Sequence, residues 1–184
     1  VCKYSNYEKK IKSMGFKTRH LNINRRSVNP LKELFCLIKF YKIEKNFEPD
    51  IIQSIALKPI LYTSLISRFI RNTKILLCVV GLGFLFINKN TSTSLIKYFY
   101  LALIKIFLIK NKALFIFQNN DDKSIFKNKN IIKYSKSKII RGSGVDTSKF
   151  KKKNTKKIFD VIFHSRVLYD KGFLELINAI KILK

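Results

Sequence analysis

The stretch Lys74-Ile75-Leu76-Leu77-Cys78-Val79-Val80-Gly81-Leu82-Gly83 is a run of apolar residues that ends abruptly in two glycines. A short apolar run without polar alternation is typical of a strand that is buried on both faces, as in a parallel sheet. We therefore predict a buried strand over residues 74–80. In open parallel sheets ligands bind beyond the carboxyl ends of the strands, so we predict that Gly81 and Gly83 line a cleft. A simple break of the strand is the alternative.

Strand and helix signals alternate on both sides of this stretch. Further strands are predicted over residues 16–23, 50–55, 113–117, 138–141 and 158–163. Helices are predicted over residues 7–14, 30–46, 59–70 and 92–110, in a short segment that Asn119 to Asp122 caps, and at the end of the chain. This alternation indicates an α/β fold with a parallel sheet and helices on both of its faces.

The lysine-rich run over residues 151–157 has no apolar anchor, and a new strand signal follows it. We therefore predict a first domain over residues 1–150, a linker over 151–157 and the opening βα unit of a second domain over 158–184. The chain begins at Val1 and stops at Lys184 within a predicted helix. We accordingly expect a fragment in which the first strand and most of the second domain are missing.

The chain carries 38 Lys and Arg residues against 11 Asp and Glu residues, which gives a net charge of +27. Such a charge is typical of proteins that bind nucleic acid or an anionic membrane surface. The excess is mostly lysine, and it accompanies an excess of Ile, Asn, Phe and Tyr, all of which have A/T-rich codons. We therefore attribute much of the charge to base composition and expect peripheral contact with an anionic membrane, without nucleic acid. A non-enzymatic basic module that binds nucleic acid or membrane is the alternative function.

Cysteine usage and hydropathy indicate a cytoplasmic protein. Cys2, Cys36 and Cys78 are far apart and lack metal-ligand spacing, so they are expected to be reduced thiols. The apolar stretches over residues 75–87 and 95–109 are too short, or too often interrupted by lysine, to count as membrane spans. For the helix over residues 95–109, packing in the core and contact with lipid are both open interpretations.

Two segments near the end of the chain are typical of phosphate binding. The turn Gly142-Ser143-Gly144 follows a predicted strand, and Arg166 and Lys171-Gly172 lie at the next junction between strand and helix. Two cations beside a helix start favour an anion, because the exposed N–H groups and the helix dipole attract negative charge. We predict that Arg166, Lys171 and Gly172 bind a diphosphate, with an ordinary solvated surface as the alternative.

Seven segments in fixed order carry a resemblance to a known family. They are Arg25-Arg26-Ser27-Val28-Asn29-Pro30-Leu31, Pro49-Asp50, Lys58-Pro59 with Tyr62, Gly81 to Phe86, Phe117 to Asp122, Gly142 to Asp146 with Phe150, and Arg166 to Gly172 with Glu175. Together they resemble the family-4 glycosyltransferases, and within them the bacterial branch whose N-acetylgalactosaminyltransferases extend polyprenyl-diphosphate-linked sugars.

This resemblance implies two facing Rossmann-like domains, of which the first holds the acceptor and the second the nucleotide sugar. It implies transfer of a sugar, with an N-acetylhexosamine expected, from a UDP-sugar to a polyprenyl-diphosphate-linked saccharide in the synthesis of a surface polysaccharide or glycan. The anomeric configuration is retained, and neither a cofactor nor a metal ion is expected. The expected location is cytoplasmic, peripheral at the inner face of the plasma membrane.

The resemblance also assigns residues to roles. Arg166 and Lys171 would hold the donor diphosphate, and Gly81, Gly83, Gly142 and Gly144 would line the cleft. Arg26 and Lys58 would lie on the acceptor side. Ile60 stands where the branch usually has Asn, which leaves the local turn open. The acidic pair that contacts the donor has no counterpart, so the chain alone is expected to be inactive.

Three other polar residues have competing interpretations. His164 is placed to act as a general acid, but a structural role is the more frequent use of a lone histidine near a strand end. Asp121 and Asp122 are either a metal pair or part of a helix cap, and we favour the cap because no other ligand type accompanies them.

Overall fold

The computed structural model describes residues 1, 6–24, 29–70, 72–82, 91–108, 113–133, 135–142, 144–151, 156–165, 167 and 171–183. The chain divides into two compact units, Val1–Gly144 and Val145–Lys184. The predicted domain and linker boundaries at residues 150 and 158 stay predictions.

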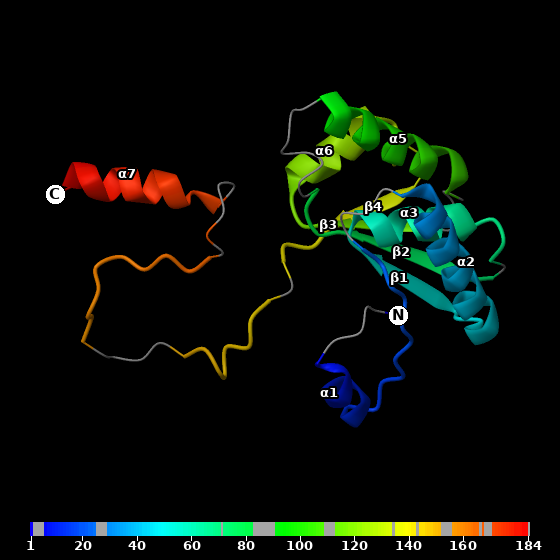
Figure 1. Ribbon diagram of the computed structural model, residues 1–184, viewed down its shortest axis with the longest axis horizontal. Coiled ribbons are helices and arrows are strands. Elements are labelled where there is room, and N and C mark those ends of the chain that lie inside the picture. The colour runs from blue at the N-terminus through cyan, green and yellow to red at the C-terminus, as the bar shows by residue number, and fades with distance from the viewer. Residues whose placement is uncertain are drawn as a thin grey trace. The chain divides into compact units, whose positions relative to one another are not determined.

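The first unit is built on a four-stranded sheet in the order β1-β2-β3-β4 (Figure 1). The strands are β1 (Ile51–Ile55), β2 (Lys74–Val79), β3 (Ala113–Phe117) and β4 (Lys136–Ile139). Each neighbouring pair is parallel. All four carboxyl ends therefore lie at one edge of the sheet, and the predicted α/β, Rossmann-like parallel arrangement is confirmed.

The helices are α1 (Glu8–Ser13), α2 (Pro30–Phe47), α3 (Leu57–Ile66), α5 (Thr91–Phe107) and α6 (Asn120–Asn128) in the first unit, and α7 (Phe173–Leu183) in the second. The helices that connect successive strands, α3, α5 and α6, contribute to one core cluster on one face of the sheet, so the described residues do not place helices on both faces as predicted. Pro30 begins α2 as predicted, because proline needs no N–H partner at a first helical position. The Asn29 side chain caps this helix by accepting a hydrogen bond from the Lys32 N–H at 3.2 Å.

The core lies on one face of the sheet, where β2 and β3 contribute alternate apolar side chains. Phe115 and Phe117 are fully buried and contact Phe126 of α6, with ring centroids 5.7 and 5.3 Å away. The same core cluster includes Leu101 and Ile104 of α5. Burying each such side chain contributes about 1.5–3 kcal/mol, so this layer provides much of the stability of the unit.

For helix α5, the sequence left core packing and lipid contact as open interpretations. Leu101, Ile104 and the following Leu108 are buried in the core, so core packing of one face is confirmed. Leu95 and Phe99 are largely exposed, and contact of that face with lipid stays a prediction. Among the described residues, no helix combines the length and apolar character needed to cross a bilayer.

Two predicted strands are wrong. Residues 16–23 form no strand, although His20 makes an isolated β-bridge; only Leu21 is buried there, and the side chains of Thr18 and His20 contact Glu8. Residues 158–163 of the second unit form no strand either, and most of their apolar side chains are exposed. A strand needs a hydrogen-bonded neighbour, and the described residues of the second unit offer none.

Smaller differences concern the ends of elements and the cysteines. Strand β4 lies two residues before its predicted position, and α3 runs from Leu57 to Ile66 instead of from 59 to 70. Cys78 is a buried free thiol, as predicted, whereas Cys36 is free and only partly buried. Cys2 lies outside the described residues.

Candidate functional site at the carboxyl edge of the sheet

The carboxyl edge of the sheet brings together four loops of the first unit. Ala56 follows β1, Gly81 lies beyond β2, Gln118 follows β3, and Gly142 lies beyond β4. Two backbone hydrogen bonds continue the pairing into this edge: the Ala56 N–H donates to the Cys78 carbonyl at 3.1 Å, and the Ile140 N–H donates to the Phe117 carbonyl at 2.8 Å. The loops therefore start from fixed positions, which a binding site requires.

Ala56 has an unusual backbone at this edge. Its φ of 77° and ψ of 160° belong to a region that is used almost only by glycine. Its carbonyl accepts a hydrogen bond from the Ile60 N–H at 3.1 Å, so the start of α3 holds the strained residue in place. Such strain costs about 1–3 kcal/mol and concentrates at functional sites. An alanine gives no sequence signal of this conformation, and sequence reasoning missed it.

Lys58, predicted on the acceptor side, lies two residues beyond Ala56, and its side chain is only 8% exposed. Its ammonium donates to Glu33 Oε1 at 2.8 Å and to the Asn24 carbonyl at 2.6 Å. The Tyr62 hydroxyl donates to the other carboxylate oxygen, Glu33 Oε2. Burial, and then the hydrogen bond to Glu33, raise the pKa of Tyr62, so this hydroxyl stays protonated and remains a donor. The structure thus joins the predicted cation to a carboxylate and a phenol.

Sequence reasoning did not identify Glu33. A weak signal was available, because Glu33 is the only acidic residue between Glu8 and Glu44 in a strongly basic chain. Its partners, however, are 25 and 29 positions away, and only the packing of α2 against α3 brings them within reach.

The predicted cleft glycines lie where the prediction placed them, beyond the strand ends. Gly81 has a φ of +103° and Gly142 a φ of +73°, both in a region that other residues rarely adopt. A Cβ built on either glycine would meet no atom within 4 Å, so conformation and not crowding requires glycine here. Gly144 has a φ of +77°. Their contact with a ligand stays a prediction, and Gly83 lies outside the described residues.

The predicted donor residues belong to the second unit, which is described by itself. Lys171 is exposed, and Gly172 adopts a φ of +72° directly before α7. The Gly172 carbonyl accepts the Leu176 N–H at 3.1 Å, so Gly172 occupies the first position of the helix start, as a phosphate-binding role needs. Arg166 and the acceptor-side Arg26 lie outside the described residues.

The remaining polar candidates differ in their hydrogen-bond partners and exposure. The Asn119 side chain caps α6 by accepting the Asp122 N–H at 2.7 Å, and it donates to Asp122 Oδ2 at 3.1 Å, which confirms the capping interpretation. His20, which the sequence analysis did not single out, has its Nε2 3.1 Å from a Glu8 carboxylate oxygen. His164 is exposed, and its role as a general acid stays a hypothesis.

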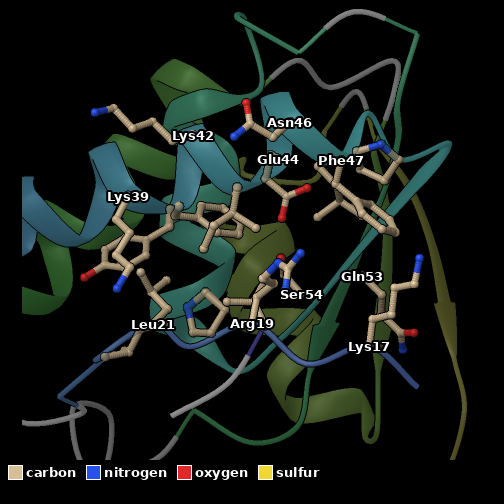
Figure 2. A pocket seen from close by; sticks show the side chains of 18 of the residues that line it. Lys17, Arg19, Leu21, Lys39, Lys42, Glu44, Asn46, Phe47, Gln53 and Ser54 are labelled. Carbon is tan, nitrogen blue, oxygen red and sulfur yellow. The ribbon is translucent and has the colours of Figure 1, made fainter. Parts of the chain in front are cut away.

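A hollow of about 940 Å³ lies along the outer side of β1, between the segment before α2, the second half of α2 and the start of α3 (Figure 2). Lys17, Arg19, Lys39 and Lys42 line it and make it strongly positive. Glu44 is directed from α2 into the hollow and is 8% exposed, and this burial raises the pKa of its carboxyl group. No pattern in the sequence predicts this hollow.

Comparison with known proteins decides the family. The model of the glycosyl transferase 4-like family matches residues 1–119, which include β1, β2 and β3 together with Lys58 and Gly81. The chain belongs to this family. The predicted resemblance is thereby confirmed, and the carboxyl edge described above is that of a glycosyl transferase 4-like domain.

A curated relative of this glycosyl transferase 4-like chain is an N,N'-diacetylbacillosaminyl-diphospho-undecaprenol alpha-1,3-N-acetylgalactosaminyltransferase from Campylobacter jejuni subsp. jejuni serotype O:2. The two sequences are 26% identical over 192 aligned positions, which cover 97% of this chain and 50% of the relative. The chain therefore spans about half the length of the curated relative that it matches.

Proposed function

We propose that the gene product is a retaining glycosyltransferase that moves a sugar, an N-acetylhexosamine, from a UDP-sugar to a polyprenyl-diphosphate-linked saccharide. The family match supports glycosyl transfer, and the name of the bacterial relative supports a lipid-linked acceptor. The observation that carries the proposal is the carboxyl edge itself. There a nearly buried lysine, a strained alanine and two left-handed glycines follow neighbouring parallel strands.

The acceptor side of this proposal belongs to the first unit. A lipid diphosphate is an anion, and Lys58 provides a cation at the edge where ligands of parallel sheets bind. Arg26 is proposed to add a second cation. Since Glu33 compensates the charge of Lys58, the lysine acts as an oriented donor and contributes less as a bare charge.

The donor side belongs to the second unit. Lys171, Arg166 and the N–H groups at the start of α7 are proposed to hold the two phosphates of UDP. Negative charge grows on the diphosphate as the glycosidic bond breaks, and cations that are already in position stabilise the transition state more than the ground state. We expect these side chains to act without a bound metal ion or cofactor.

The proposed place of reaction is the inner face of the plasma membrane. A net charge of +27 favours attraction to anionic lipids, and each basic residue near the surface adds about 1 kcal/mol. Surface polysaccharide or glycan synthesis is the process that a lipid-linked acceptor at this location serves.

Titration of UDP into the full-length gene product tests the donor site by calorimetry. Losing one charge-assisted hydrogen bond costs about 1.5–3 kcal/mol, so Lys171→Ala and Arg166→Ala should each weaken UDP binding about ten- to a hundred-fold. Lys181→Ala, an exposed lysine near the other end of α7, is the matched control and should leave UDP affinity unchanged. Absence of UDP binding by the wild type, together with tight DNA binding at moderate salt, would favour the basic module instead.

A further inference from the structure

Helix α5 presents apolar side chains on two faces. Leu101 and Ile104 are buried in the core, whereas Leu95, Phe99 and Ile106 are 74%, 62% and 59% exposed. Positions 95, 99, 102 and 106 recur every three or four residues, so they form one stripe along the helix. Single exposed apolar residues are normal, but a stripe of them marks an interaction site. We call this stripe the outer face of α5, and its residues are Leu95, Tyr98, Phe99, Ala102 and Ile106.

Cations border the outer face of α5 at two places. The Lys129 ammonium, just beyond α6, lies 4.6 Å from the centre of the Tyr98 ring and donates to the Tyr98 hydroxyl at 3.0 Å. The Arg68 guanidinium, just beyond α3, donates to the Ile106 carbonyl at 3.0 Å. Lys105 is exposed beside Ile106. Attraction to a charged surface acts through the net charge of such groups and requires no free hydrogen-bond donor.

The segment around α5 carries no negative charge that would cancel these cations. The sequence has no Asp or Glu between Asp50 and Asp121, a stretch that contains α3, β2, α5 and β3. Helix α2 also exposes apolar side chains, but it carries Glu33 and Glu44. An apolar stripe with a basic border fits an anionic bilayer, where lipid phosphates attract the cations and acyl chains surround the apolar side chains. A nucleic acid would attract the same cations but offers the aliphatic side chains no comparable environment.

We propose that the outer face of α5 docks the protein on the anionic surface of a lipid bilayer, with the helix parallel to the membrane plane. The apolar stripe then enters the boundary between headgroups and acyl chains, while Arg68, Lys105 and Lys129 remain among the lipid phosphates. Tyr98 suits this depth, because its ring is apolar and its hydroxyl is polar. This inference rests on the proposed function, because it names the surface that holds the enzyme where a lipid-linked acceptor resides.

Sedimentation with vesicles tests the docking surface without any substrate. The full-length gene product is mixed with vesicles of phosphatidylglycerol and phosphatidylcholine in equal parts, or of phosphatidylcholine alone. The wild type should bind the anionic vesicles and bind the neutral ones much more weakly. The double variant Leu95→Gln/Phe99→Gln should weaken binding to the anionic vesicles about ten- to a hundred-fold, because two apolar side chains no longer enter the lipid. Glutamine is a good helix former, so circular dichroism should show the fold unchanged.

The double variant Leu31→Gln/Phe35→Gln is the matched control. These two side chains are 67% and 73% exposed, and they have the same spacing on α2 as Leu95 and Phe99 have on α5. The control should bind the anionic vesicles as the wild type does. Unchanged binding in the α5 variant, or an equal loss in both double variants, would overturn the inference. If the α5 substitutions instead convert a dimer into a monomer in light scattering and leave vesicle binding intact, the outer face joins two copies and the membrane assignment is wrong.

The basic border is tested by a single charge. Lys105→Gln should weaken binding to the anionic vesicles about five-fold and leave binding to the neutral vesicles unchanged. An equal loss on both kinds of vesicle would contradict attraction to lipid phosphates.

Sugar transfer keeps this inference distinct from the proposed function. The α5 variant should lose more activity toward a lipid-linked acceptor embedded in anionic vesicles than toward a short-chain acceptor in solution. If the wild type binds vesicles through α5 but transfers no sugar, the transfer proposal fails and the docking surface stands. If the wild type transfers sugar and the α5 variant matches it in vesicle binding and on the embedded acceptor, only the docking surface is wrong.

Discussion

Ala56→Gly should stabilise the protein, although glycine usually destabilises. Ala56 holds a φ of 77° with a ψ of 160°, and this strain costs about 1–3 kcal/mol in a residue with a Cβ. Glycine removes the strain but gives the unfolded chain more freedom, which costs about 0.4–1 kcal/mol. The net expectation is a gain of about 0.5–2 kcal/mol in the free energy of unfolding.

Urea unfolding followed by circular dichroism measures this difference, with an unchanged slope showing that the same surface is exposed. Ala102→Gly is the matched control, because Ala102 is exposed in the middle of α5 and has an ordinary helical backbone. There the same substitution should cost about 1 kcal/mol. The two variants should therefore shift the midpoint in opposite directions.

Ala56→Gly should impair acceptor binding although it stabilises the fold. A glycine loosens the turn that leads to Lys58, so we expect Ala56→Gly to raise the acceptor KM while it raises stability. If Ala56→Gly destabilises as much as Ala102→Gly does, the strained backbone and the argument built on it are wrong.

Three further predictions concern the first unit. Phe126→Ala should lower the free energy of unfolding by about 3–5 kcal/mol in urea titration, because it empties a fully buried site between two phenylalanines; a loss below about 1 kcal/mol would contradict the core as described. Asn119→Ala should cost about 1 kcal/mol by removing the cap of α6, whereas Asp121→Ala, in an exposed position of the same turn, should cost less. Burial raises the pKa of the Glu44 carboxyl group in the folded protein. The stability that its neutral form contributes is therefore present below the pKa of the unfolded state and is lost as the pH rises through the pKa of the folded state. Glu44→Gln should thus stabilise the protein at pH 7 and not at pH 4, and equal effects at both pH values would argue against a buried carboxylate.

The parts of the fold that the sequence predicts best are those with a strong local pattern. The apolar runs of β1, β2 and β3 and the proline start of α2 lie where the pattern placed them. Residues 158–163 carry a similar apolar run and form no strand, and residues 16–23, where Phe16, Leu21 and Ile23 stand among basic and polar residues, form only an isolated bridge at His20. An apolar run shows that a segment can pair, but pairing depends on a neighbouring strand, which no local pattern contains.

The residues of the candidate site were predicted from two kinds of signal. Gly81 and Gly142 were predicted because they follow strand signals, and Lys58 was predicted from the family resemblance; their contact with a ligand stays a prediction. The partners of Lys58 were not predicted, since Glu33 lies on another helix and meets the lysine only when α2 packs on α3. The strain at Ala56 was also missed, because the neighbouring hydrogen bonds and not the residue type impose it.

The mass of the lipid product tests the central claim most directly. The full-length gene product is incubated with UDP-N-acetylhexosamine and a short-chain polyprenyl-diphosphate-linked monosaccharide, and the lipid fraction is examined by mass spectrometry. The account predicts a lipid that is heavier by one N-acetylhexosamine residue, together with release of an equal amount of UDP. A folded protein that leaves the lipid mass unchanged and releases no UDP from any UDP-sugar would contradict it.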